Sequence, residues 1–383
     1  MAEKENKQSK AGSDFLNFNA SWITMVIYIA YLGGMIFLQK HFYETLFASV
    51  NGLNYYVFIF LSFIFGILLS ALFYNVSKVI VAKAIGYDVV YLKLLGFTTD
   101  FTKKEKKTSF RFLDMTDIMM KFAPKDDDIE KNPRRLFLSG LIGEAVFEAI
   151  ALILFFVLGF RKDPNVSSFI GYMSLFAGIY GLIMVIYEFL PFRQDKPTDF
   201  FNLATTKSKE EQSCFNICAV NFRNELSGKD FLVPTTDDYS TYYPVHALYY
   251  VYLDHLYKNE LEAANKALKC MKENIKKFDE NERYLPSMED MYLHYLINDE
   301  AGADRIYLKL RSEDKANISH PQDLGDFRTA ISVFHHISKD EASYQKAIKE
   351  FEAKANSYPD GERVKNEKRL FQAVRESIEK TNQ

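Results

Sequence analysis

Hydrophobic and polar positions divide the chain into two unlike halves. Four long apolar runs, at about residues 22–38, 55–73, 136–160 and 169–190, fall within the first 200 residues, and none follows. Each run approaches the roughly 20 residues that a helix needs to cross the hydrocarbon core of a bilayer. The pattern predicts an all-α polytopic membrane domain at residues 21–200, after a polar tail at 1–20 and before a soluble domain at 201–383.

The distribution of Lys and Arg predicts which loops face the cytoplasm. The loop 86–135 carries eleven such residues, the polar tail carries three lysines, and the loop 40–54 carries only Lys40. Positively charged loops remain on the cytoplasmic side of a membrane. We therefore expect a multi-pass membrane protein with both termini in the cytosol. The Lys-, Ile-, Phe- and Asn-rich composition is typical of a low-GC bacterium, so the expected membrane is a bacterial plasma membrane. The first apolar run is too long for a signal-peptide core and is interpreted as an anchor.

Two stretches of the loop 86–135 have strand character. Residues 87–97 (YDVVYLKLLGF) and 109–113 are rich in β-branched and aromatic side chains, which predicts a small cytosolic β-hairpin at the membrane edge. The lysines at 103–107 between them are typical either of a solvated turn or of a surface that contacts anionic lipid headgroups.

The soluble half has the periodicity of helical hairpins. Helical patterns fall near 201–225, 244–257, 259–277, 286–297, 299–311, 322–337, 340–356 and 361–380. A repeat of about forty residues aligns LYKNE at 256–260 with LINDE at 296–300, and similar turn residues recur at 338–342. The segment resembles tetratricopeptide-type repeats, which form concave peptide-binding surfaces. A helical domain without such a groove is the alternative.

Charge and cysteine content exclude several classes of protein. A net charge of −3 gives no reason to expect a nucleic-acid partner. Cys214, Cys218 and Cys270 are too few and too unevenly spaced for a disulfide framework, and no further soft ligands accompany them. We expect reduced, structural thiols.

The end of the second apolar run contains a recognisable frame. Tyr74, Asn75 and Lys78 belong to the pentad YNVSK, and Gly86 follows eight residues after Lys78. This stretch resembles the active-site helix of the site-2 protease family of intramembrane zinc metalloproteases. That family has His-Glu-x-x-His at the pentad and Gly at the same offset.

The resemblance extends over roughly residues 55–203. Gly140 and Glu144 stand where the family has the Gly and Asn of Gly-Pro-x-x-Asn. Glu188 replaces the Asn of the family's Asn-x-x-Pro turn, Pro191 matches its Pro, and Asp199 stands at the third zinc ligand. The resemblance implies that Tyr74, Lys78 and Asp199 lie close together at the cytosolic membrane edge.

The residues at these positions do not support the family's zinc chemistry. A protonated Lys78 has no lone pair for a metal, and the Asn75 amide cannot act as the general base that a Glu supplies. None of the seven histidines lies on the second, third or fourth apolar run. We therefore expect no catalytic residues, no metal and no cofactor, with Tyr74, Asn75, Lys78 and Asp199 marking a degenerate site.

Carboxylates surround this degenerate site. Glu144 and Glu148 lie one helical turn apart inside the third apolar run, where a carboxylate normally has a partner or a polar cavity. With Glu188, they are predicted to form a polar binding or structural site. A specific hypothesis follows, in which an ion pair of Lys78 with Asp199 or Glu144 replaces the metal.

These observations predict a membrane-embedded pseudoprotease. It would bind a peptide or a transmembrane segment of a client protein and recruit a cytosolic protein through its helical tail. One alternative is an active intramembrane zinc metalloprotease whose ligands are not recognised. Another is a membrane scaffold or accessory subunit of a peptide export or regulatory system.

Overall fold

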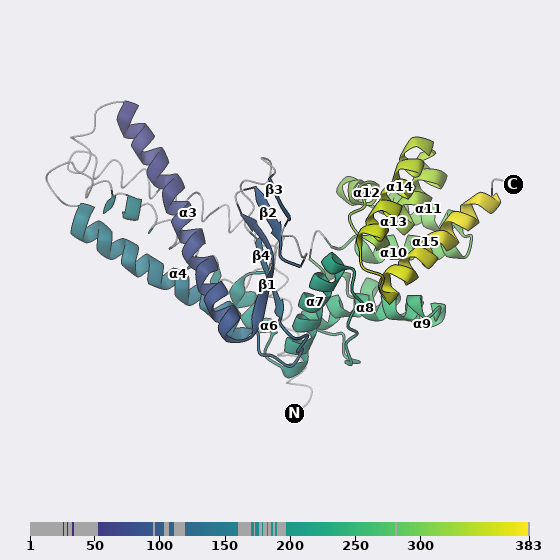
Figure 1. Cartoon of the computed structure of the whole chain (residues 1–383), viewed down its shortest axis with the longest axis horizontal. Helices are drawn as coiled ribbons and strands as arrows, with labels where there is room; N and C mark the ends of the chain where they lie inside the picture. The colour runs from purple at the N-terminus through teal and green to yellow at the C-terminus, as the bar shows by residue number, and fades with distance from the viewer. Residues whose placement is uncertain are drawn as a thin grey trace. The chain divides into compact units, whose positions relative to one another are not determined.

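The structure is a computed structural model. It describes residues 53–94, 96–102, 107–110, 119–159, 197–279 and 282–381, with isolated positions between 26 and 33 and between 170 and 189. The chain forms two compact units (Figure 1). Unit 1 contains Met1–Val89 and Asn132–Lys207, and unit 2 contains Val90–Lys131 and Ser208–Gln383. Most of the loop 86–135 is thus grouped with the helices that follow residue 208.

Unit 1 is built around two helices that pack side by side. Helix α3 (Leu53–Ala84) lies against α4 (Arg134–Leu154), which continues as a π-helix, η2 (Phe155–Gly159), and the short α6 (Asp199–Thr205) packs on α4. Small residues allow the close approach, since a Cβ atom on Gly143 would collide with the Ser77 hydroxyl. Beside this contact the rings of Phe73 and Phe147 stack with their centroids 4.7 Å apart.

The prediction of an all-α fold with four membrane-spanning helices is wrong. Among the described residues one helix, Arg134–Leu158, is long and apolar enough to cross a membrane, and it coincides with the predicted third span. The predicted spans 22–38 and 169–190 lie largely outside the described residues. The run 55–73 belongs to α3, which becomes polar over its C-terminal third, and the side chains of several of its residues are outside the described part.

A four-stranded antiparallel sheet also replaces the predicted hairpin. Its strands are β1 (Tyr87–Leu94), β2 (Phe97–Asp100), β3 (Lys107–Phe110) and β4 (Met119–Pro124), in the order β3-β2-β1-β4. Gly96, at φ 81°, turns the predicted single strand 87–97 back on itself, so that Leu94 pairs with Phe97. Strand β4 was missed because MMKFAP has no apolar–polar alternation. The residues 103–106 of the Lys-rich turn lie outside the described part of the chain.

The rest of unit 2 is helical, close to the predicted pattern. Its elements are α7 (Lys209–Ser227), α8 (Tyr242–Tyr257), α9 (Leu261–Glu273), η3 (Ile275–Lys277), α10 (Leu285–Leu296), α11 (Glu300–Lys309), α12 (Ser312–Ser319), α13 (Leu324–Ser332), η4 (Val333–Ser338), α14 (Glu341–Ser357) and α15 (Glu362–Thr381). Helix α12 was not predicted. The predicted helix 201–225 is divided because Ser208 caps α7, its hydroxyl accepting the Glu211 N–H at 3.1 Å.

Consecutive helices pair as hairpins whose turns follow the forty-residue repeat. The pairs α8–α9, α10–α11 and α13–α14 pack together, with Asn259, Asn298 and Lys339 in the turns at φ 62°, 58° and 51°. The first two turns are Schellman motifs. In the first, the N–H of Asn259 donates to the Leu256 carbonyl at 3.1 Å and that of Glu260 to the His255 carbonyl at 2.9 Å.

A histidine and a carboxylate reinforce these two turns. His255 Nδ1 lies 2.7 Å from Glu260 Oε2, and His294 Nδ1 lies 2.8 Å from Asp299 Oδ2. In the third turn the Asp340 N–H donates to the Phe334 carbonyl. This acceptor is one residue farther back along the chain than in the first two turns, because the π-helix η4 contains one extra residue. The turn residues Asn259, Asn298 and Lys339 are 39 and 41 residues apart, and α12 lies within the second interval.

The three cysteines are free thiols. Burial raises the pKa of Cys214 to about 12, and it also raises the pKa of Cys218. Both thiols are protonated at neutral pH, which makes them poor nucleophiles and poor metal ligands.

The left-handed turn at Asn259 provides a test of the repeat. The Asn259→Val variant should be less stable than Asn259→Gly by about 1–2 kcal/mol, because a β-branched side chain is strained at positive φ. The measurement is chemical unfolding of the full chain in detergent, followed by circular dichroism. Since Asn259 is exposed, no core contact changes in either variant. Equal stability of the two variants would contradict the assigned turn.

Candidate functional site

Three side chains from α3 and α6 meet in a buried ion cluster. Lys78 Nζ lies 2.7 Å from Asp199 Oδ1, and the Tyr74 hydroxyl donates to Asp199 Oδ2, also at 2.7 Å. The Lys78 ammonium donates in addition to the Tyr74 oxygen at 2.5 Å. The predicted ion pair is therefore confirmed with Asp199 as the partner, while Glu144 accepts a hydrogen bond from Ser70 at 2.9 Å.

Local structure explains how the three side chains converge. Tyr74 and Lys78 are four residues apart on α3 and so lie on one face of the helix. Asp199 is the first residue of α6, where Thr198 is the N-cap and its hydroxyl accepts the Phe201 N–H at 3.2 Å. The backbone N–H of Asp199 donates to Glu188 Oε2 at 2.7 Å. The cap and Glu188 together fix the direction of the Asp199 carboxylate.

Gly140 of α4 forms the third side of the cluster. A Cβ atom there would lie 2.5 Å from Asp199 Oδ2, 2.6 Å from Lys78 Cε and 2.7 Å from Tyr74 Cε2. These separations are shorter than van der Waals contact, so only glycine lets α4 approach the three side chains this closely. The sequence reasoning singled out Gly140 without foreseeing this role.

Burial determines the electrostatics of the cluster. The side chains of Lys78 and Asp199 are 13% and 3% exposed. Burial raises the pKa of Asp199, while the Lys78 ammonium and the Tyr74 hydroxyl oppose the rise by stabilising the carboxylate. Burial and the negative charge of Asp199 raise the pKa of Tyr74, which remains a proton donor. Both oxygens of Asp199 thus accept a hydrogen bond, one from Lys78 and one from Tyr74.

Asn75, the remaining residue of the degenerate site, is turned back on its own helix. Its amide donates to the Ala71 carbonyl at 2.7 Å, and the Ser77 hydroxyl donates to the Phe73 carbonyl at 2.8 Å. Neither hydrogen bond is directed at Asp199. The cluster thus links α3 and α6 against Gly140 of α4.

Polar residues form one stripe on each of the two long helices. Each stripe has a spacing of four residues, and the members are Ser70, Tyr74 and Lys78 on α3 and Gly140, Glu144 and Glu148 on α4. Glu144 and Glu148 are 2% and 5% exposed. Neither oxygen of Glu148 makes a hydrogen bond of ordinary geometry to a described residue. Ser70 was missed by the sequence reasoning, although its spacing from Tyr74 is the signal that identifies it.

The ion pair predicts a specific pattern of stabilities. The Lys78→Met variant leaves Asp199 buried without its counter-charge and should lower the free energy of unfolding by about 3–5 kcal/mol. The double variant Lys78→Met with Asp199→Leu should recover much of that loss, because no charge is then left unpaired. Thermal unfolding of the full chain in detergent measures both effects, with exposed Lys83→Met as the control. Additive losses in the double variant would argue against a coupled pair.

No protein-family model, no curated protein and no solved structure matches this chain.

Proposed function

We propose that the chain is a membrane-bound pseudoprotease of site-2 type, which binds a peptide or a transmembrane segment of a client and recruits a cytosolic protein through its helical repeats. One observation carries the proposal. Residues 74, 78 and 199, at the three positions where the resemblance expects zinc ligands, meet within hydrogen-bond distance although Asp199 lies more than a hundred residues from the other two.

The character of the cluster supports a non-catalytic role. The Lys78 ammonium is a fixed positive charge at a ligand position, and it repels a divalent cation instead of donating an electron pair to it. Both oxygens of Asp199 are already engaged. Because Asn75 cannot accept a proton from water, the base that the protease mechanism requires is also missing. An ion cluster of this kind supplies the helix-to-helix link of a metal site without its Lewis acidity.

The outer face of α4 supports client binding. Ile142, Val146, Ile150 and Ile153 are 53%, 52%, 44% and 61% exposed, and their spacing places them on one side of the helix. The opposite side carries Gly140, Glu144 and Glu148 and packs into the unit. An apolar stripe on a helix that is long enough to span a membrane fits against lipid or against an apolar helix of another protein.

The helical repeats of unit 2 support the recruitment of a second protein. Their hairpins are stacked, as in repeat proteins that bind peptides along an extended surface. In the second hairpin, the large apolar side chains of Ile297 and Leu308 are 64% and 73% exposed. Leu308 lies on α11.

Reinstating the zinc ligands tests the positional match. The combined variant Tyr74→His, Asn75→Glu and Lys78→His should bind one more zinc ion per chain than wild type, because two imidazoles would then face Asp199. Adding Asp199→Asn should abolish the gain, and the matched triple variant Tyr74→Phe, Asn75→Gln and Lys78→Met should show none. Metal analysis of the full chain after gel filtration measures the stoichiometry. No additional zinc in the first variant would contradict the match.

Photo-crosslinking tests the proposed binding. With a photoreactive residue at Val146, we expect adducts with integral membrane proteins, and with one at Leu308, adducts with proteins that alkaline carbonate extracts from the membrane. The adducts should contain full-length clients. Crosslinking of Val146 to lipid alone would refute client binding by α4. Client fragments that disappear in an Asp199→Asn variant would instead indicate an active protease.

A further inference from the structure

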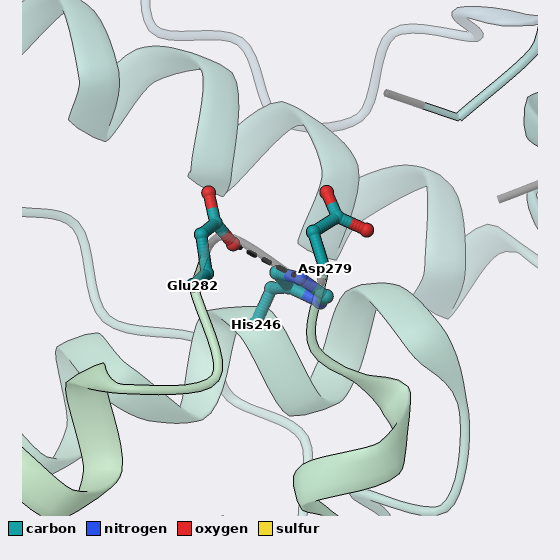
Figure 2. Close-up of side chains that lie close together, drawn as sticks. All are labelled: His246, Asp279 and Glu282. Atoms are coloured by element: carbon teal, nitrogen blue, oxygen red, sulfur yellow. Dashed lines mark ion pairs between the residues drawn. The ribbon is translucent and has the colours of Figure 1, made fainter. Parts of the chain in front are cut away.

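A second cluster of ionisable side chains lies in unit 2, where α8 meets the connection between α9 and α10. It consists of His246 on α8, Asp279 just after η3, and Glu282 shortly before α10. One potential ligand atom from each residue lies within 4.8 Å of the others. Figure 2 shows the two carboxylates on either side of the His246 ring.

The imidazole of His246 has a defined orientation. Its Nδ1 lies 2.8 Å from the Tyr242 carbonyl, which can only accept, so this nitrogen carries a proton. In the neutral ring Nε2 therefore holds a lone pair. Nε2 is buried and makes no hydrogen bond of ordinary geometry to a described residue. Metal-binding histidines in proteins commonly donate their other N–H to a backbone carbonyl in this way.

The separation of His246 and Glu282 is one that two ligands of a shared metal ion would have. His246 Nε2 lies 3.3 Å from Glu282 Oε2, beyond the usual range for an N–H···O hydrogen bond. Zinc binds nitrogen and oxygen at about 2.0–2.2 Å, so neighbouring donors on a tetrahedral ion lie about 3.3–3.5 Å apart. By contrast, the His255–Glu260 pair of the first repeat turn is in direct contact at 2.7 Å.

Neighbouring groups hold the two carboxylates in place. The Tyr242 hydroxyl donates to Asp279 Oδ1 at 2.8 Å, and the N–H of Glu282 donates to the Asp279 carbonyl at 2.9 Å. The His246 ring lies between Tyr242 and Phe278, with centroid distances of 4.2 and 4.9 Å. Tyr242 thus orients both the histidine and one carboxylate. Such support around the ligands is characteristic of metal sites with a defined geometry.

We propose that His246, Asp279 and Glu282 bind a divalent transition-metal cation of the Zn²⁺ type. One imidazole and two carboxylates neutralise a dication, and the imidazole favours zinc over Mg²⁺ or Ca²⁺, which prefer oxygen ligands. The Glu282 side chain is 43% exposed, so a cation can reach the cluster from solvent. The ion ties α8 to the α9–α10 connection. This site is independent of the ion cluster in unit 1 and of the function proposed for it.

Zinc binding by the tag-free full chain in detergent tests the proposal. Calorimetric titration with zinc chloride should give one site per chain, and Mg²⁺ and Ca²⁺ should not compete. The variants His246→Gln, Asp279→Asn and Glu282→Gln should each weaken binding by at least about tenfold. The matched control His255→Gln also removes a histidine from a His–Glu pair and should leave the affinity unchanged. Circular dichroism checks that each variant is folded. Because Glu282 is partly exposed, its substitution should disturb the fold least of the three.

Two results would overturn the proposal. One is the absence of zinc uptake by wild type. His246 and Glu282 would then form only a direct, proton-mediated pair. The other is equal zinc affinity in wild type, His246→Gln and Glu282→Gln, which would place the zinc elsewhere. Neither result would affect the test of the zinc ligands restored at residues 74–78. That test measures only the zinc that the variant gains over wild type.

Discussion

The ion pair between Lys78 and Asp199 is the interaction on which the arrangement of unit 1 depends. A charge that is removed from water is tolerated only beside an opposite charge and hydrogen-bond donors. Asp199 satisfies this requirement through Lys78 and Tyr74, and the approach of all three is possible because Gly140 has no side chain. The ion pair thus links α3 to α6 against α4, and the Ser70–Glu144 hydrogen bond adds a second polar link between α3 and α4.

The same constraint organises the core of unit 2. Arg328 is completely buried, and it lies 2.9 Å from Glu289 and 3.4 Å from Glu367. Tyr252 and Tyr257 donate to these two carboxylates, which connects α8, α10, α13 and α15. Such a network gives little net stability compared with apolar packing, but each misplaced helix would leave a charge unpaired. The hairpins of the repeat therefore stack in one register.

The ion cluster around Asp199 in unit 1 and the cluster around His246 in unit 2 differ in one chemical respect. At the cluster of unit 1 Lys78 supplies the positive charge, and both carboxylate oxygens of Asp199 accept hydrogen bonds. At the cluster of unit 2 the histidine directs Nε2 toward two carboxylates, whose charges a bound dication would balance. A structural role follows naturally for the first cluster, whereas the second has the electronic requirements of a cation site.

The sequence by itself determined the features that depend on neighbouring residues. Helical periodicity located nearly all helices of unit 2, the forty-residue repeat marked the turns at Asn259 and Asn298, and spacing along α3 placed Tyr74 beside Lys78. Tertiary structure decided which distant groups meet, namely Asp199 with Lys78, β4 with β1, and His246 with Asp279 and Glu282. The sequence predicted four membrane spans, whereas among the described residues one helix is long and apolar enough to cross a membrane. The reason is physical, because periodicity records the face that a segment buries, whereas pairing depends on loops and packing that no local pattern encodes.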